Sequence, residues 1–404
     1  MKVVQINAIY GSKSTGTIVR EIQSCCHEHG IECHVAYSIS DRQEKKVPGG
    51  YHIGNTLTVK WHALLSRFFG RQAYFNRFTT WLLIKWLGRM HPDIVHLHNL
   101  HSNYIYLNGL LRYLARHDIA TVITMHDCWY FTGGCTHYTS VKCQRWQVGC
   151  GDCPIRRKIP SWFRDTTQTI LKDRSRYLNS IPRLTLVGVS EWTANEAKKS
   201  VLKNNDIIFI HNGYDLNVFR PVSSDKRSAL GIGNRFVIIG PFDKWQLPIN
   251  KATLDYFISK MTDNMVLVLF GGSKRLDITD AKVKQIGYVS SRQEMAEIYS
   301  MGDVMVNCSR EDTLSSINIE CQACGTPVIT YDATGLQETV DGCSGYAVET
   351  GNKEELWKKV IEVKEKGKVY YSRRCRDWIL DNFEEHDSYA KYIQLYNKIN
   401  KRIN

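Results

Sequence analysis

Two acidic residues bracket the start of an expected helix in the second half of the chain. Asp312 lies in the loop after a short apolar strand over 304–307, and Glu320 follows eight positions later, inside the helix. The unpaired N–H groups at a helix start form a ready site for a phosphate. A carboxylate beside a phosphate repels it but accepts hydrogen bonds from hydroxyl groups. The pattern therefore indicates a nucleotide-sugar, with one acid on the ribose and the other on the transferred sugar.

The residues around these acids indicate where the helix begins and ends. Ser315 and Ser316 are both suitable N-cap residues for a helix that starts near position 316. Gly325 suits the left-handed conformation that ends a helix, and Pro327 beyond it cannot continue one. We therefore place both serines in the expected donor-binding site.

This segment resembles the donor-site motif of glycosyltransferase family 4, the retaining enzymes of the GT-B fold. That motif has two acids eight positions apart and ends in Gly-x-Pro-Val, as residues 325–328 do here. The resemblance implies that Glu320 holds the ribose diol and that Asp312 contacts the donor sugar. The first acid is usually a glutamate, and many members have glycine or proline within 313–316, so the sugar preference stays open.

The resemblance implies further donor-binding residues. Tyr288 follows an expected strand where members of the family frame the base, and Gly16 belongs to a loop that they place against the donor. The family neutralises the departing diphosphate with an arginine and a lysine near the start of the second domain. Lys244 and Lys251 are the cations available there, although both could equally be surface residues.

A histidine in the first half of the chain is a further catalytic candidate. His126 ends an expected buried strand over 121–125, and ligands of parallel sheets bind at the carboxyl ends of the strands. The resemblance implies that His126 contacts the transferred sugar, and with Asp312 and Lys251 it forms the expected catalytic set. Three other histidines either line the acceptor site or are packed structurally: His96, His98 and His101.

The sequence also bears on the role of metal in the reaction. No Asp-x-Asp occurs, the usual metal–diphosphate handle of the other large glycosyltransferase architecture, so we expect no catalytic metal. The charge of the leaving diphosphate must then be met by the helix start, backbone N–H groups and lysines. The resemblance implies transfer with retention, in which the departing phosphate takes the proton of the acceptor hydroxyl.

Four cysteines form a second pattern, with the spacing C-x7-C-x6-C-x2-C. Four thiolates that leave no open coordination position are typical of a structural zinc site that pins a loop. Buried free thiols and an iron–sulfur centre are the alternatives. The possible zinc ligands are Cys135, Cys143, Cys150 and Cys153.

Short β-branched runs alternate with helical patterns along all 404 residues, which indicates an α/β fold with parallel sheets. Two domains are expected for this length. We expect the GT-B fold, with two Rossmann-like doubly wound domains that face a central cleft. The acceptor-side domain covers 1–212, with a Cys-rich insertion over 128–154; the nucleotide-sugar domain covers 213–380; and a last helix over 381–404 packs back on the first domain.

The positive charge of the chain is unevenly distributed. Residues 1–212 hold 27 Lys and Arg against 14 Asp and Glu, whereas the remainder holds 26 of each. The stretch 45–92 carries eight of these cations, many aromatic rings and no carboxylate. This pattern suits an anionic membrane surface. An ordinary solvated helical pair is the main alternative, and nucleic acid is not expected.

Together these patterns predict a hexosyltransferase that moves a sugar from a UDP- or GDP-sugar to a saccharide acceptor, in capsule or exopolysaccharide assembly. We expect the acceptor to be lipid-linked. The thirteen cysteines and the absence of a signal-like segment favour the cytoplasm, with peripheral contact at the plasma membrane. The alternatives are a sugar-nucleotide 2-epimerase of the same fold and a catalytically inactive protein that binds through its basic half.

Overall fold

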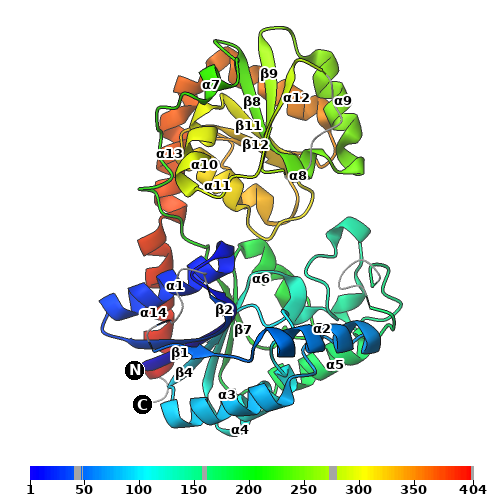
Figure 1. Cartoon of the computed structure of the whole chain (residues 1–404), viewed down its shortest axis with the longest axis vertical. Coiled ribbons are helices and arrows are strands. Elements are labelled where there is room, and N and C mark those ends of the chain that lie inside the picture. The colour runs from blue at the N-terminus through cyan, green and yellow to red at the C-terminus, as the bar shows by residue number, and fades with distance from the viewer. Residues whose placement is uncertain (41–46, 48, 157–161, 273–279, 402–404) are drawn as a thin grey trace. The chain divides into compact units, whose positions relative to one another are not determined.

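The computed structural model describes residues 1–40, 47, 49–156, 162–272 and 280–401. The chain divides into two compact units, of which one comprises Met1–Asn212 with His386–Asn404 and the other comprises Gly213–Glu385. Each unit is an α/β layer structure built on one parallel sheet (Figure 1).

The first unit contains a seven-stranded sheet with the strand order β3-β2-β1-β4-β5-β6-β7. Neighbouring strands are parallel throughout. The order reverses between β1 and β4, and such a switch point is where open α/β sheets bind ligands. The strands are β1 (Lys2–Tyr10), β2 (Glu32–Ser40), β3 (Tyr51–His52), β4 (Ile94–Leu97), β5 (Ala120–Met125), β6 (Leu184–Gly188) and β7 (Asp206–Phe209).

Helices cover both faces of this sheet because successive strand residues point to opposite sides. Val4 and Ile6 of β1 belong to one buried cluster, and Val3 belongs to another on the opposite face. The α-helices are α1 (Lys13–Glu28), α2 (Thr56–Phe69), α3 (Arg77–Met90), α4 (Leu107–Arg116), α5 (Thr167–Leu178), α6 (Glu191–Lys198) and α14 (Glu385–Lys401). Three short 3-10 turns lie between β5 and α5: η1 (Cys128–Phe131), η2 (Thr139–Val141) and η3 (Arg145–Gln147).

The last helix, α14, packs on the first sheet. The Tyr396 hydroxyl lies 2.6 Å from His96 Nδ1, and the Tyr392 hydroxyl lies 2.9 Å from Thr124 Oγ1. The boundary expected at 380/381 falls inside helix α13, and the chain passes to the first unit at 385/386 instead.

The second unit contains a six-stranded parallel sheet with the order β10-β9-β8-β11-β12-β13, which reverses between β8 and β11. Its strands are β8 (Phe236–Pro241), β9 (Met265–Phe270), β10 (Val283–Ile286), β11 (Val304–Asn307), β12 (Val328–Tyr331) and β13 (Tyr346–Val348). Its helices are α7 (Lys226–Ala229), α8 (Phe242–Trp245), η4 (Pro248–Asn250), α9 (Lys251–Lys260), α10 (Arg292–Met301), α11 (Ser316–Ala323), η5 (Thr334–Thr339), α12 (Lys353–Lys366) and α13 (Lys368–Phe383).

Over the described ranges, no helix combines the length and the apolar character needed to cross a bilayer.

Candidate active site

The start of helix α11 lies beside the switch point of the second sheet. Ser315 occupies the N-cap position, but among the described residues its side chain forms no capping bond with the helix. Its hydroxyl oxygen instead accepts a hydrogen bond from Asn307 Nδ2, at 3.3 Å, on the end of β11. The first turn contains no acidic residue. The N–H groups from Ser316 onward are therefore left available to an anion.

Glu320 projects from α11 into a half-buried position. The Tyr299 hydroxyl donates a hydrogen bond to its Oε2 at 3.0 Å. Loss of hydration raises the pKa of Glu320 to about 7, against the smaller opposing effects of the Tyr299 bond and the Arg292 charge. Near neutral pH this carboxyl therefore exists in both protonation states, and a ligand that donates hydrogen bonds would favour the ionised form.

Tyr214 connects the two acids electrostatically. Burial raises the pKa of its phenol well above the ordinary value, and the charges of Glu320 and Asp312 raise it further. Both carboxylates therefore act on the same phenol. Tyr214 lies next to the expected domain boundary at 212/213, and no sequence pattern singled it out.

The backbone of Asp312 is held by the segment after β12. Asp312 N donates to Thr334 Oγ1 at 3.0 Å, and Gly335 N donates to Asp312 O at 3.0 Å. These bonds join the loop before α11 to the start of η5, so the position of Asp312 depends on a segment more than twenty residues away.

Arg310, which no sequence pattern singled out, lies just after the end of β11. Arg310 Nε donates to Asn250 Oδ1 at 3.3 Å, and Asn250 Nδ2 donates to the carbonyl oxygens of Lys244 and Cys308 at 3.0 and 2.9 Å. Burial raises the pKa of the Cys308 thiol to about 12, and the charges of Lys244 and Arg310 oppose this shift. These two cations therefore gather at the switch point between β8 and β11.

Lys251 and Tyr288, two further predicted donor-site residues, have exposed side chains. The side chain of Lys251, the first residue of α9, is 76% exposed and its Nζ lies 3.6 Å from Asp255 Oδ2. Tyr288 is 76% exposed and follows the edge strand β10, which β9 and β8 separate from β11. Lys251 directly follows Asn250, whereas Tyr288 follows an edge strand, so their donor-binding roles stay predictions.

In the first unit, His126 follows β5 and takes part in a chain of buried hydrogen bonds. His98 Nδ1 lies 3.0 Å from His126 Nε2, and His98 Nε2 lies 3.0 Å from Gln5 Oε1. Gln5 Nε2 donates to Val19 O, so Gln5 Oε1 must accept, and the proton of His98 is on Nε2. Nδ1 of His98 then accepts, and Nε2 of His126 carries the proton.

The same environment keeps His126 neutral. Burial lowers its pKa to about 4, against an opposing effect of the Asp127 carboxylate. In a neutral ring with its proton on Nε2, Nδ1 is an acceptor. His126 can therefore accept a hydrogen bond from a hydroxyl group through Nδ1.

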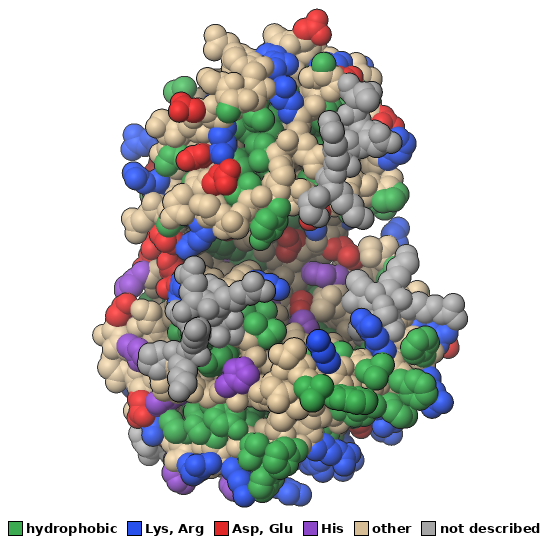
Figure 2. Space-filling view, in the orientation of Figure 1, with side chains coloured by type: hydrophobic (Ala, Val, Ile, Leu, Met, Phe, Trp, Pro, Cys, Tyr) green, Lys and Arg blue, Asp and Glu red, His purple; other side chains and the backbone are tan. Residues whose placement is uncertain are grey.

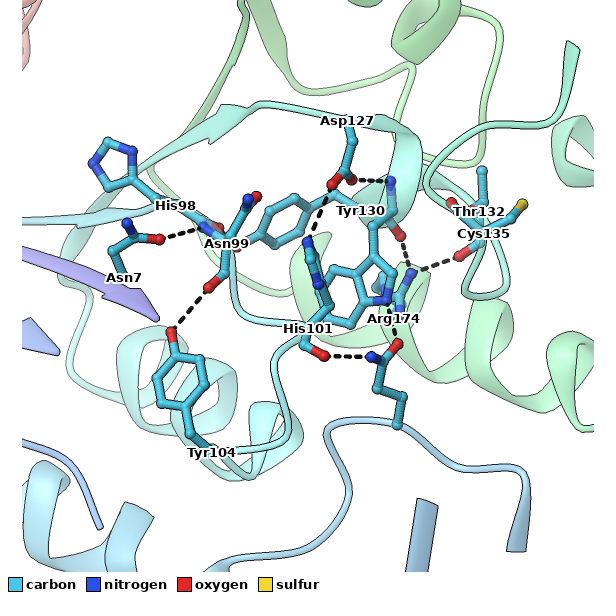
Figure 3. A network of polar contacts seen from close by, with 12 residues as sticks. Asn7, His98, Asn99, His101, Tyr104, Asp127, Tyr130, Thr132, Cys135 and Arg174 are labelled. Atoms are coloured by element: carbon cyan, nitrogen blue, oxygen red, sulfur yellow. Dashed lines mark hydrogen bonds and ion pairs between the residues drawn. The ribbon is translucent and has the colours of Figure 1, made fainter. Parts of the chain in front are cut away.

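The other histidines lie in two different environments. His96 bonds Tyr396 and Thr124 within the core, which makes it a packed structural residue. His101 Nε2 lies 3.1 Å from Asp127 Oδ2, and the other oxygen of Asp127 accepts from Trp129 N at 2.8 Å (Figure 3). His101 is thus part of a polar network at the carboxyl ends of β4 and β5.

Gly16 lies in the first turn of α1, where the helix packs closely on β1. A Cβ atom there would lie 3.1 Å from Ile9 Cγ2 and 3.3 Å from Gly11 N. Gly11 N also donates to Gly16 O at 3.0 Å. This close approach explains a glycine at position 16 without any ligand.

The expected zinc ligands come together in space. Cys135, Cys143, Cys150 and Cys153 all line one small cavity, and all four are free thiols. No three of their Sγ atoms lie within 4.8 Å of one another among the described residues.

Two doubly wound parallel sheets, each with polar residues at its switch point, place the protein in the GT-B class of glycosyltransferases. The chain belongs to glycosyltransferase family 4: the family model described as "Glycosyltransferase Family 4" matches residues 15–218, and that described as "Glycosyl transferases group 1" matches residues 234–366. The expected fold and enzyme class are both confirmed.

Curated relatives agree with this assignment. The chain is 21% identical over 363 residues to "Putative colanic acid biosynthesis glycosyl transferase WcaC" of Escherichia coli (strain K12), covering 86% of this chain and 87% of that protein. It is 23% identical over 264 residues to "N-acetyl-alpha-D-glucosaminyl L-malate synthase" of Bacillus anthracis, covering 60% and 68%.

Solved structures show the same fold at low sequence identity. Sucrose-phosphate synthase from Thermosynechococcus elongatus superposes with a TM-score of 0.69 at 17% identity, over 99% of both chains. Anabaena HepE in complex with UDP-glucose superposes with a TM-score of 0.64 at 14% identity, over 98% of this chain and 100% of that one.

Proposed function

We propose that this glycosyltransferase moves a sugar from a UDP- or GDP-sugar to a saccharide acceptor, with retention at the anomeric carbon, in surface-polysaccharide assembly. The observation that carries the proposal is the uncapped start of α11, flanked by Asp312 and Glu320. Further support comes from the colanic acid relative and from HepE, a protein of the same fold that was solved with UDP-glucose.

Each part of this arrangement has a role in the proposal. The N–H groups of Ser316 and the next residues bind the diphosphate, with the charges of Arg310 and Lys244 nearby. Glu320 accepts hydrogen bonds from the ribose diol, and Asp312 accepts from the donor sugar. His126, neutral with Nδ1 as an acceptor, contacts a hydroxyl of the transferred sugar. No metal is needed to offset the charge of the leaving group.

In the proposed reaction the acceptor hydroxyl attacks the anomeric carbon on the face from which the diphosphate departs. The bond between the anomeric carbon and the phosphate oxygen breaks, the new glycosidic bond forms, and the hydroxyl proton passes to the departing phosphate oxygen. No protein base is required for this step.

A panel of UDP- and GDP-sugars, each with and without saccharide acceptors, tests the proposal. We expect release of nucleotide that depends on one donor and accelerates with acceptor, and an NMR spectrum that shows the donor's anomeric configuration in the product. An inverted product would contradict retention. Turnover to a free sugar epimer without any acceptor would instead identify a 2-epimerase.

We further propose that the acceptor is lipid-linked, because helices α2 and α3 present an apolar face to solvent. On α2, Leu57, Trp61, Leu64 and Phe68 are each 57–64% exposed. Their spacing of four, three and four residues places them on one side of the helix. Phe78 of α3 is 69% exposed. Figure 2 shows hydrophobic side chains gathered over these helices, with Lys and Arg at their borders.

The charge around this face favours an anionic membrane as its partner. Lys45 and Lys46 of the basic stretch lie outside the described residues. Positions 49–92 contain no Asp or Glu, and Lys85 Nζ lies 3.7 Å from the centre of the Trp81 ring. Proteins that bind at a membrane surface insert apolar rings into the headgroup layer and place cations against the anionic lipids. The face of α2 and α3 has both features. The cations of the described part are Lys60, Arg67, Arg71, Arg77, Lys85 and Arg89.

Co-sedimentation with vesicles tests this surface. We expect binding to vesicles with 30% phosphatidylglycerol, weaker binding to pure phosphatidylcholine, and a loss of about tenfold for the variant Trp61→Ser with Phe68→Ser. Val369→Ser is the matched control, because Val369 is 91% exposed in the second unit. Equal binding by the double variant, or by neutral vesicles, would contradict the proposal.

A further inference from the structure

The segment between β5 and α5 has little regular structure of its own. Over the described residues of 128–166 it contains only the three short turns η1, η2 and η3. It nevertheless encloses a cavity of about 20 Å³ that is lined by all four cysteines of this segment together with buried Trp146 and Trp162. This volume is close to that of one water-sized sphere. The four thiols therefore line the same small cavity.

The backbone at this point allows no larger residue. A Cβ atom on Gly133 would lie 2.6 Å from Thr167 O and 2.9 Å from Cys150 Cβ. On Gly134, which has a φ of +136°, it would lie 2.5 Å from the Trp162 ring. Glycines at 133 and 134 thus let the chain pass close to Cys150 and Trp162.

A buried cation beside the thiols gives independent evidence. Arg174 is 2% exposed, and its guanidinium stacks on Trp129 with 3.7 Å between Cζ and the ring centre. Its Nη1 donates to the carbonyl oxygens of Trp129 and Thr132, but its Nε has no hydrogen-bond partner among the described residues. Burial lowers the pKa of Arg174 to about 10, and the charges of Tyr74, Tyr130, Cys150 and Cys135 oppose this shift. A buried guanidinium needs nearby negative charge.

We propose that Cys135, Cys143, Cys150 and Cys153 bind one structural Zn²⁺ ion. Binding releases four thiol protons to solvent and leaves a zinc tetrathiolate with a charge of −2, which Arg174 partly offsets. Zinc–sulfur bonds of about 2.3 Å in a tetrahedron bring sulfurs to within about 4 Å of one another. The Sγ atoms must therefore move closer together than in the present arrangement when the ion binds.

The ion would hold a network that reaches the candidate active site. Thr132 Oγ1 donates to Cys135 O at 2.6 Å, and Arg174 binds the carbonyl oxygens of Thr132 and Trp129 (Figure 3). Trp129 N in turn donates to Asp127 Oδ1 at 2.8 Å. The zinc is thus a structural support for Asp127, the residue that follows His126.

Metal analysis of the full chain, purified without chelators or metal-affinity resin, tests the proposal. We expect one zinc per chain by mass spectrometry, and release of that zinc as a mercurial reagent modifies four thiols. Cys135→Ser and Cys150→Ser should each lower the zinc content at least fivefold. Cys343→Ser is the control, because Cys343 is exposed in the second unit and should leave the content unchanged.

A second measurement covers the case in which a cysteine variant fails to fold. Exchange of the metal in the unmodified chain for Co²⁺ should give the intense visible bands of tetrahedral cobalt thiolate. Protein without metal whose four thiols react directly with a disulfide reagent would overturn the proposal. Iron with inorganic sulfide in place of zinc would overturn it as well. None of these readouts depends on transferase activity, so the result stands apart from the donor proposal.

Discussion

Both units carry polar residues at the carboxyl ends of their central strands, but the two sites are prepared differently. In the first unit the side chains bond one another, as Gln5, His98 and His126 do in sequence. In the second unit the start of α11 has no side-chain cap among the described residues, and Glu320 has a pKa near 7. The polar groups of the first unit are thus already fixed by bonds to one another. The second unit offers backbone N–H groups that a ligand can bind and a carboxyl whose protonation a ligand can change.

The largest expected effect comes from removing the acid inside α11. Glu320→Ala should lower kcat/KM about 100-fold, because hydrogen bonds to a charged acceptor contribute about 1.5–3 kcal/mol each. Steady-state kinetics with the accepted donor measure this. Glu354→Ala, at an exposed acid of α12, is the control and should change little. A loss below threefold for Glu320→Ala would mean that the second unit does not bind the donor as proposed.

The next prediction compares two cations of the second unit, Arg310 and Lys251. Arg310→Ala should lower kcat about 30-fold, as expected for a charge near the leaving diphosphate. Lys251→Ala should change kcat less than twofold, because Lys251 is exposed and pairs with Asp255. Single-turnover rates compare the two variants. A larger loss for Lys251→Ala would instead support the role that the sequence motif assigned to that lysine.

A smaller effect tests whether the first unit is fixed by its internal bonds. Gln5→Leu removes the acceptor that sets the tautomer of His98, so His126 should lose its preference for the proton on Nε2. We expect kcat to fall about fivefold with little change in KM, because the lost hydrogen bond orients His126 without touching the substrate. Nitrogen chemical shifts of the His126 ring provide the direct readout. An unchanged tautomer would show that the ring is held by other contacts.

The smallest effect concerns stability and pH. In the folded chain the pKa of Glu320 is about 7, against an ordinary value of 4.5 in the unfolded chain. Between pH 4.5 and 7 the folded chain therefore keeps this proton, whereas the unfolded chain has lost it. The free energy of unfolding therefore falls as pH rises through this window, by about 1–3 kcal/mol from this group. Glu320→Gln removes the dependence, so it should be more stable than the unmodified protein above pH 7 and similar to it below pH 4.5. Urea unfolding at several pH values measures the difference, and parallel curves would contradict it.

Local patterns allowed part of this site to be predicted from sequence. The start of α11, its end at Gly325 and the positions of both acids depend on neighbouring residues, and the helix was expected where it occurs. Arg310 was missed because its role depends on Asn250, sixty positions away, on the other side of the switch point. Tyr214 was missed for a similar reason, since Asp312 and Glu320, whose charges act on it, lie about a hundred positions further along the chain. The tautomer of His126 requires Gln5, which no spacing rule connects to it.

The return of α14 to the first sheet has a practical consequence for dissecting the protein. A fragment that ends at residue 212 would lack Tyr392 and Tyr396, and would leave His96 and Thr124 without the hydroxyl groups that they bond. The first unit should therefore be produced with residues 386–401 supplied, either as a separate peptide or by fusing them ahead of residue 1. The second unit, by contrast, is a single uninterrupted stretch of chain and can be expressed directly as 213–385.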